Sequence, residues 1–158
     1  MKNIGSHKSV DIHKLNPNDP GLMESLLSLF GEAFDEPDTY NSARPDQSYF
    51  RELLSNQMFV ALVALEEECV IGGLAAYELP KFEQERCEYY IYDLAVSAEH
   101  RRKGIATALI DELRAIAAAR GAHVIFVQAD YGDEPAIALY TKLGTRADVM
   151  HFDIAVEQ

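Results

Sequence analysis

The stretch that decides the fold runs from Tyr89 to Thr107 and reads Tyr-Tyr-Ile-Tyr-Asp-Leu-Ala-Val-Ser-Ala-Glu-His-Arg-Arg-Lys-Gly-Ile-Ala-Thr. Its first part, Tyr89–Val96, is mostly apolar and aromatic, which predicts a strand. Three adjacent cations and Gly104 follow, and from there apolar residues recur at helical spacing. The stretch therefore predicts a strand, a basic turn and a helix over Ile105–Arg120.

The basic turn has the features of a phosphate-binding site. Arg101, Arg102 and Lys103 stand together, although the formal net charge of the chain is -12. The first N–H groups of a helix have no partner within it, and the helix dipole adds about half a positive charge there. A plain helix cap with neighbouring basic residues is the alternative interpretation. The turn matches neither the nucleoside-triphosphate loop nor the dinucleotide-binding glycine motif.

Length and composition limit the class of protein. A chain of 158 residues with 48% hydrophobic and 25% charged residues predicts one globular domain, here residues 1–158. No apolar run reaches the length of about 20 residues that a membrane helix needs. The first residues lack the apolar stretch of a signal peptide. We therefore expect a cytoplasmic protein with no membrane partner.

Charge, cysteines and histidines limit the ligands. Acidic residues outnumber basic ones by 26 to 14, which argues against nucleic acid and fits a cationic substrate. The alternative is that the negative charge only keeps the protein soluble. Cys69 and Cys87 lack the spacing of a zinc site, and the five histidines are scattered. We expect reduced thiols and no metal site.

Hydrophobic periodicity along the rest of the chain predicts strands mixed with helices. Strands are expected over residues 9–15, 58–65, 69–79, 89–96, 124–127 and 149–156. Helices are expected over 20–34, from Pro45 through Leu54, over 105–120 and after Asp133 through Leu143, with 35–38 as an acidic loop. Because hairpins are mixed with strand–helix–strand crossovers, this order predicts an α/β (α+β) fold, a mixed central sheet with helices on both faces.

Three local signals refine these elements. Asp19 stands directly before Pro20, and Asp133 stands shortly before Pro135, so both aspartates are expected to be helix N-caps. Gly72-Gly73 lies inside a predicted strand. A glycine pair there indicates a bulge or a close approach of another part of the chain.

Two motifs on these elements resemble those of the GNAT acetyltransferase superfamily. Arg101–Ala106 matches its acyl-coenzyme A signature, Q/R-x-x-G-x-G/A, and Asp93–Val96 precedes that signature at the usual distance. The second signature is matched by Asp133-x-x-Ala136-x-x-Leu139-Tyr140-x-x-Leu143-Gly144, with Asp133 in place of the more usual asparagine. The resemblance implies the GNAT fold and acetyl-CoA as the cofactor, with coenzyme A as the product.

Four further segments resemble the type I aminoglycoside (gentamicin) 3-N-acetyltransferases, and they lie outside the shared cofactor signature. They are residues 79–84, 90–96, 127–133 and 150–154. This resemblance implies acetyl transfer to the 3-amino group of a 2-deoxystreptamine ring, and hence resistance to gentamicin-type antibiotics. Direct attack in a ternary complex is expected, because no motif of a nucleophilic serine or cysteine occurs. The superfamily also makes a homodimer the expected assembly.

The resemblance assigns roles at the cofactor site. Backbone N–H groups of the basic turn would hold the pyrophosphate, and a backbone amide near Leu94 or Ala95 would stabilise the oxyanion. Tyr140 corresponds to the general acid for the departing thiolate, although a core tyrosine with a satisfied hydroxyl is the alternative. The expected cofactor-binding residues are Leu94, Ala95, Val96, Arg101, Arg102, Lys103, Gly104, Ile105, Ala106, Thr107, Asp133 and Tyr140.

Asp93 is the leading candidate for the general base. A carboxylate inside an apolar strand has a raised pKa, which suits the removal of a proton from an ammonium near neutral pH. A structural aspartate satisfied at a bulge is one alternative, and a water relayed from Glu88 or a tyrosine is another. Simple alternation places Asp93 on one face with Ile91 and Ala95, unless a bulge swaps the faces.

A polycationic substrate needs carboxylates that are not already paired, although each single carboxylate is more commonly a solvated charge or a cap. The expected substrate-binding residues are Asp35, Glu83, Asp93, Asp130 and Glu134, with Glu36, Asp38, Asp133, Asp148 and Asp153 as further candidates. Two other functions stay open. One is N-acetylation of another small polyamine or amino sugar, and the other is a non-catalytic acyl-CoA-binding module.

Overall fold

The computed structural model describes residues 10–157. The predicted strand residue Ser9 and most of the N-terminal stretch used to exclude a signal peptide therefore lie outside the described residues. The chain forms two compact units, the first through Gln128 and the second from Ala129 onward. A single domain over the whole chain stays a prediction.

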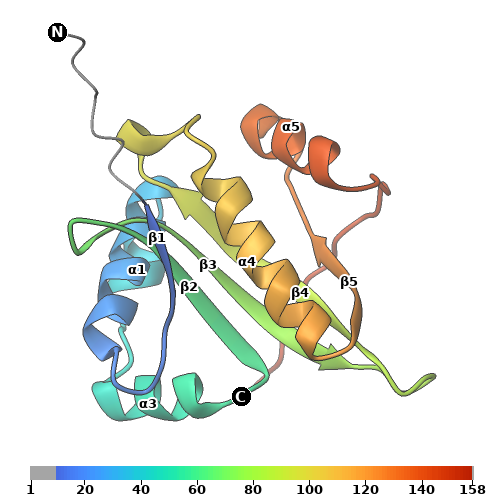
Figure 1. Cartoon of the computed structure of the whole chain (residues 1–158), viewed down its shortest axis with the longest axis horizontal. Helices are drawn as coiled ribbons and strands as arrows, with labels where there is room; N and C mark the ends of the chain where they lie inside the picture. The colour runs from blue at the N-terminus through green and yellow to red at the C-terminus, as the bar shows by residue number, and fades with distance from the viewer. Residues whose placement is uncertain (1–9, 158) are drawn as a thin grey trace, which may run out of the picture. The chain divides into compact units, whose positions relative to one another are not determined.

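The sheet of the first unit has five strands, which lie side by side in chain order (Figure 1). Their bounds are β1 Asp11–Lys14, β2 Phe59–Glu66, β3 Cys69–Pro80, β4 Cys87–Val96 and β5 Ala122–Val127. The first four strands pair antiparallel, and β5 pairs parallel to β4. A parallel neighbour needs a long crossover, which a helix between β4 and β5 provides. The predicted mixed sheet is confirmed.

Helices cover both faces of this sheet. Their bounds are α1 Pro20–Ala33, α2 Pro37–Asn41, α3 Gln47–Ser55, the 3₁₀ turn Ala98–His100 and α4 Ile105–Ala119. Figure 1 shows α4 lying across the sheet, and it contacts all five strands. On the other face, Phe30 of α1 and Phe50 of α3 share one buried cluster with Phe59 and Val63 of β2. Residues 59–64 of β2 are all buried, as expected for a strand covered on both faces.

Two helix boundaries differ from the sequence-based expectation. The acidic stretch expected as a loop contains the start of α2, with Pro37 at its first position. Proline is well suited to that position, because its missing N–H would have no partner there. The next helix begins at Gln47 rather than at Pro45, since Asp46 is its N-cap and accepts a hydrogen bond from the Tyr49 amide at 2.9 Å.

Asp19 is the N-cap residue of α1, as predicted, but its carboxylate makes no cap hydrogen bond to that helix. Asp19 Oδ2 instead accepts the backbone N–H of Asn16 at 2.9 Å and lies 2.9 Å from His13 Nε2 of β1. The carboxylate therefore closes the turn between β1 and α1 rather than the first turn of the helix.

The glycine pair in β3 marks a close approach, as predicted. A Cβ on Gly73 would overlap Leu26 Cδ1 of α1 and would lie 3.0 Å from the Leu62 carbonyl oxygen. Only a residue without a side chain lets α1 pack this closely on the sheet. The β2–β3 register also shifts between Ala64 and Leu65, opposite this pair.

A bulge in β4 decides which way its side chains face. Ala75 of β3 pairs with Asp93, whereas Ala76 pairs with Ile91, so Tyr92 is an extra residue without a partner. Ala75 and Ala95 both pack with the α1 cluster. Since Asp93 pairs with Ala75 and successive residues alternate, Asp93 shares the α1 face with Ala95 but not with Ile91.

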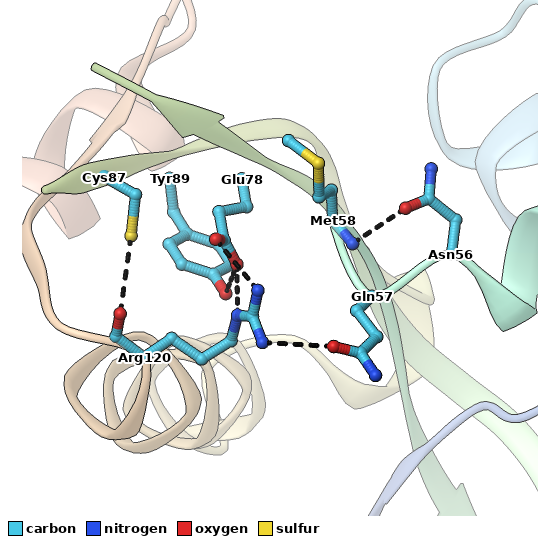
Figure 2. Close-up of polar contacts among 7 residues, drawn as sticks. All are labelled: Asn56, Gln57, Met58, Glu78, Cys87, Tyr89 and Arg120. Atoms are coloured by element: carbon cyan, nitrogen blue, oxygen red, sulfur yellow. Dashed lines mark hydrogen bonds and ion pairs between the residues drawn. The ribbon is translucent and has the colours of Figure 1, made fainter. Parts of the chain in front are cut away.

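A buried ionic cluster ties the end of α4 to the sheet (Figure 2). Glu78 of β3 is only 8% exposed, and it is the only buried charged residue in the described part of the chain. Its Oε2 accepts a hydrogen bond from Tyr89 Oη at 2.7 Å and also contacts Arg120 Nε, and its Oε1 accepts from Arg120 Nη2 at 3.0 Å. Hydrogen bonding to Arg120 lowers the pKa of Glu78, despite its burial.

The second unit contains α5, Glu134–Leu143, and no strand among its described residues. The expected strand over residues 149–156 is therefore wrong. Its alternating apolar side chains, including Met150, Phe152 and Ile154, are at least 75% exposed. An alternating pattern describes a strand only where a neighbouring strand accepts its hydrogen bonds, and a pattern alone cannot supply that neighbour.

No helix in the described part of the chain is both long enough and apolar enough to cross a membrane.

Candidate active site

The turn before α4 has a backbone suited to an anion. Gly104 is the N-cap residue, with a φ of 79°, and no side chain caps the helix. Arg102 also has a positive φ, of 60°. Left-handed residues in such a turn direct successive N–H groups toward one point, which is how backbone amides bind phosphate. The backbone of the residues predicted to hold the pyrophosphate therefore fits a diphosphate, and the three cations belong to the same turn.

Beyond Ile91, no strand in the described part of the chain pairs with β4 on its β5 side, although Arg101 Nε donates to the Val96 carbonyl oxygen at 3.2 Å. β4 pairs with β5 only over Cys87–Ile91, whereas the strand continues to Val96. Leu94, Ala95 and Val96 thus pair with β3 on one side and extend past the last β5 partner, Val127, on the other. A backbone edge without a strand neighbour can hydrogen-bond an extended ligand. The binding of pantetheine and the stabilisation of the oxyanion by this segment stay predictions.

Asp93 lies at the bulge, partly buried, and accepts a hydrogen bond from Tyr40 Oη to its Oδ2 at 3.0 Å. Burial raises the pKa of Asp93 above its usual value, and the nearby carboxylate of Glu36 raises it further. The Tyr40 hydrogen bond acts against both, since it favours the charged carboxylate. A raised pKa is the property expected of a carboxylate that acts as general base for an ammonium group.

A cavity of about 190 Å³ opens beside Asp93 on the α1 face of the sheet. Its wall is mostly apolar, with three tyrosine rings and one carboxylate. The lining residues are Met23, Leu26, Leu27, Phe30, Pro45, Tyr49, Phe50, Leu53, Phe59, Ala75, Tyr77, Tyr92 and Asp93. A wider hollow of about 440 Å³ lies along α3 and is lined by none of the predicted site residues.

Two of the tyrosines at this cavity, Tyr77 and Tyr92, belong to a connected set of rings. The Tyr92 ring centroid lies 5.9 Å from that of Tyr77 and 5.8 Å from that of Tyr90. Tyr77 in turn lies 5.2 Å from Phe59. Aromatic faces attract cations, and more strongly where water is excluded. The cavity therefore combines a carboxylate and π faces, which suits an ammonium group.

Two of the other predicted substrate-binding acids lie in the first unit. Asp35 is exposed, with a φ of 53°, in the turn between α1 and α2. Glu83 is already paired, since its Oε1 lies 3.4 Å from Lys81 Nζ and 4.0 Å from an Arg86 nitrogen. No contact among the described residues joins either side chain to Asp93.

The remaining predicted residues lie in the second unit. Asp133 is the N-cap of α5, as predicted, and accepts the Ala136 amide at 3.3 Å. Asp130 and Glu134 are exposed on either side of it. Burial, with a smaller effect of Asp133, raises the pKa of Tyr140 to about 12, so this phenol keeps its proton at neutral pH.

Sequence reasoning missed Tyr40 altogether. It lies 53 positions from Asp93, in a helix that periodicity did not reveal. No local signal marks such a pair. Glu36 was only one of several acidic candidates, and its effect on Asp93 is visible only once α2 is placed against β4.

The first unit thus has a turn suited to an anion before α4 and, on the α1 face of the sheet, a carboxylate beside an aromatic cavity. The chain belongs to the acetyltransferase (GNAT) family, whose model matches residues 23–145. Members of this family use acetyl-CoA as the acetyl donor. A comparison with curated proteins found no match.

Solved structures of similar proteins narrow the comparison. The chain is 61% identical to the aminoglycoside acetyltransferase HMB0005 from an uncultured soil metagenomic sample, with a TM-score of 0.93 over 94% of this chain and 99% of that one. It is 31% identical to the aminoglycoside acetyltransferase meta-AAC0020, also from an uncultured soil metagenomic sample and solved in complex with sisomicin, with a TM-score of 0.87 over 94% of this chain and 97% of that one. A ribosomal-protein-alanine N-acetyltransferase from Brucella melitensis biovar Abortus 2308 is 28% identical, with a TM-score of 0.72 over 94% and 100%.

Proposed function

We propose that this protein transfers the acetyl group of acetyl-CoA to an amine of an aminoglycoside, and specifically to the 3-amino group of the 2-deoxystreptamine ring of gentamicin-type antibiotics. The observation that carries the proposal is the carboxylate of Asp93 at the wall of an aromatic cavity on the α1 face. The aminoglycoside acetyltransferase that is 61% identical over 94% of the chain supports the substrate class.

The cofactor would be held by the turn before α4 and the free end of β4. The N–H groups of residues 102–107 would bind the pyrophosphate, and Arg101 and Lys103 would add positive charge. When bound, acetyl-CoA supplies the acetyl group as an activated thioester. A backbone amide at Leu94 or Ala95 would stabilise negative charge on the carbonyl oxygen, and such a donor can contribute about 3–4 kcal/mol.

Two side chains would move the protons. Asp93 accepts a proton from the substrate ammonium, so that the neutral amine can attack and the carboxylate becomes a carboxylic acid. Tyr140 Oη holds its proton at neutral pH and is placed in the family signature to protonate the leaving sulfur. The negative charge of the chain, -12, favours the approach of a polycation.

Thiol release from acetyl-CoA, measured separately with gentamicin, sisomicin and spermidine, tests this function. We expect release with both aminoglycosides and little with spermidine, and mass and NMR mapping should place the acetyl group on the 3-amino nitrogen. Acetylation only of spermidine, or acetylation of another nitrogen, would contradict the substrate or the position.

The variant Asp93→Asn tests whether Asp93 is the general base. It removes the base but keeps the shape of the side chain, so kcat/KM should fall by about 10²–10⁴-fold. Affinity for acetyl-CoA, measured by calorimetry, should stay unchanged. Full activity of the variant would exclude Asp93 as the base. Binding of acetyl-CoA without thiol release from any amine would instead indicate a non-catalytic acyl-CoA-binding protein.

A further inference from the structure

We infer that Tyr40 is a positioning residue for the reaction, which fixes the Asp93 carboxylate toward the acceptor cavity. This inference rests on the proposed function, in which Asp93 takes the proton from the substrate amine. Tyr40 Oη donates to Asp93 Oδ2 at 3.0 Å. Tyr40 does not line the cavity, whereas Asp93 does. The tyrosine would therefore act through the carboxylate rather than on the substrate.

The ring of Tyr40 is itself held in place by α1. Its centroid lies 6.0 Å from that of Phe30 and 5.8 Å from that of Phe34. Gly31 lets α2 approach α1, since a Cβ there would lie 3.3 Å from Tyr40 Cβ and 2.8 Å from Asn41 Nδ2. A side chain held by packing loses little further entropy when it makes a hydrogen bond. The phenol is therefore preorganised to orient the carboxylate.

The groups around the Asp93 carboxylate are phenols and a carboxylate, and none of them is a cation. From α2 and its N-cap, Tyr40 and Glu36 act on this carboxylate. In the sheet, the phenols of Tyr77 in β3 and Tyr90 in β4 interact electrostatically with Asp93, and Tyr92 is the residue before it in β4. None of these groups is positively charged at neutral pH. A lysine or arginine would neutralise Asp93, whereas a phenol orients it and leaves its negative charge for a substrate ammonium.

The second carboxylate oxygen is then the one that receives the proton. Tyr40 holds Oδ2, and the contacts of the described residues give Oδ1 no partner. In the proposed step an N–H bond of the ammonium breaks, an O–H bond forms at Asp93, and the electron pair stays on the amine nitrogen. Loss of the Tyr40 hydroxyl would let the carboxylate rotate and would remove the hydrogen bond that favours its charged form.

The variant Tyr40→Phe tests this role, because it removes only the hydroxyl and keeps the packed ring. With one aminoglycoside as substrate, the acidic limb of the kcat/KM profile should move up by about one pH unit, since the charged carboxylate loses a hydrogen bond. At a pH on the acidic limb of the wild type the rate should fall by about tenfold, and on the alkaline plateau by less. Affinity for acetyl-CoA should not change.

Tyr89→Phe is the matched control. It also removes a tyrosine hydroxyl that donates to a carboxylate, but this hydroxyl donates to Glu78 at 2.7 Å on the other face of the sheet. We expect its Tm to fall while the acidic limb stays in place. If Tyr40→Phe lowers Tm but leaves the limb where it is in the wild type, Tyr40 is a structural residue and the inference is overturned.

A measurement independent of turnover separates this inference from the proposed function. Carboxyl ¹³C NMR titration, with Asp93→Asn used to assign the resonance, gives the pKa of Asp93 in the wild type and in Tyr40→Phe. A higher pKa of Asp93 in Tyr40→Phe than in the wild type supports the action of Tyr40 on this carboxylate. An equal pKa overturns the inference, whether or not aminoglycosides are acetylated. Absence of thiol release from the wild type with any aminoglycoside would overturn the proposed function, and with it the catalytic role of Tyr40.

Discussion

Single residues decide how closely the layers of the first unit approach. Leu26 is fully buried and lies against Gly73, where a Cβ would overlap its Cδ1 atom. Asp93 similarly depends on one neighbour, because Tyr40 supplies the side-chain hydrogen bond that holds its Oδ2. At this scale, the chemistry of the site depends on contacts between residues that are far apart in the sequence.

The substitution Gly73→Ala should lower stability by about 1–3 kcal/mol, because a methyl group there overpacks the core between Leu26 and the Leu62 carbonyl. Gly21→Ala is the control, since nothing lies within 4 Å of the position of its Cβ in α1. That change should leave stability equal or raise it by up to about 1 kcal/mol. Urea unfolding of both variants measures the difference, and equal midpoints would contradict the close approach of α1.

At the scale of helices and strands, the two ends of α4 have different roles. Its N-terminus, at Gly104, has backbone amides without a partner in the helix, and this is where we propose that the cofactor binds. Its C-terminus is tied to β3 and β4 through Arg120, Glu78 and Tyr89 (Figure 2). An anchored far end keeps the helix fixed, and the anion-binding turn with it.

The variant Glu78→Gln should destabilise the protein by about 2 kcal/mol at neutral pH, because Arg120 loses its charged partner, although Arg120 is partly exposed. Hydrogen bonding to Arg120 holds the pKa of Glu78 in the folded protein below its ordinary value of 4.5. Its ionic stabilisation is therefore present above about pH 4.5 and is lost as the pH falls through the lowered value.

Thermal unfolding at a series of pH values checks this expectation. The difference in Tm between wild type and Glu78→Gln should be largest near neutral pH and should shrink in acid. Asp111→Asn is the control, since Asp111 pairs with Arg114 at 2.9 Å on the surface and such pairs contribute at most about 1 kcal/mol. A difference in Tm that does not depend on pH would show that the charge of Glu78 is not what stabilises the end of α4.

The charge of the whole molecule affects how a substrate arrives. The chain carries 26 acidic and 14 basic residues, and the basic ones include the three cations before α4. A polycation and a polyanionic cofactor are thus attracted by different parts of one molecule. Long-range attraction of this kind acts on association and is screened by salt.

Raising the ionic strength from about 50 mM to about 500 mM should lower kcat/KM for an aminoglycoside by about threefold to tenfold. The effect should appear mainly in KM, because salt screens the approach of the substrate and not the chemical step. A monoamine such as glucosamine, which carries one charge, is the comparison and should respond less. An equal response of both substrates would indicate that the negative charge serves solubility alone.

Much of the fold could be predicted because its signals are local. The strand Tyr89–Val96, the basic turn and the helix after Gly104 each follow from neighbouring residues, through periodicity, unpaired helix amides and the positive φ that glycine permits. The caps at Asp46 and Asp133 are of the same kind, although the first was overlooked. The expected strand over residues 149–156 failed because a strand also needs a partner.

By itself, the sequence determined the class of this protein and the presence of a carboxylate within an apolar strand, and it predicted the place where the cofactor would bind. The tertiary structure decided which face Asp93 occupies, through the bulge at Tyr92, and brought Tyr40 and Glu36 to it from α2. The physical reason is the range of the interactions. Hydrogen bonds and φ preferences within a turn involve adjacent residues, whereas strand register and contacts across 53 positions exist only when distant segments pack together.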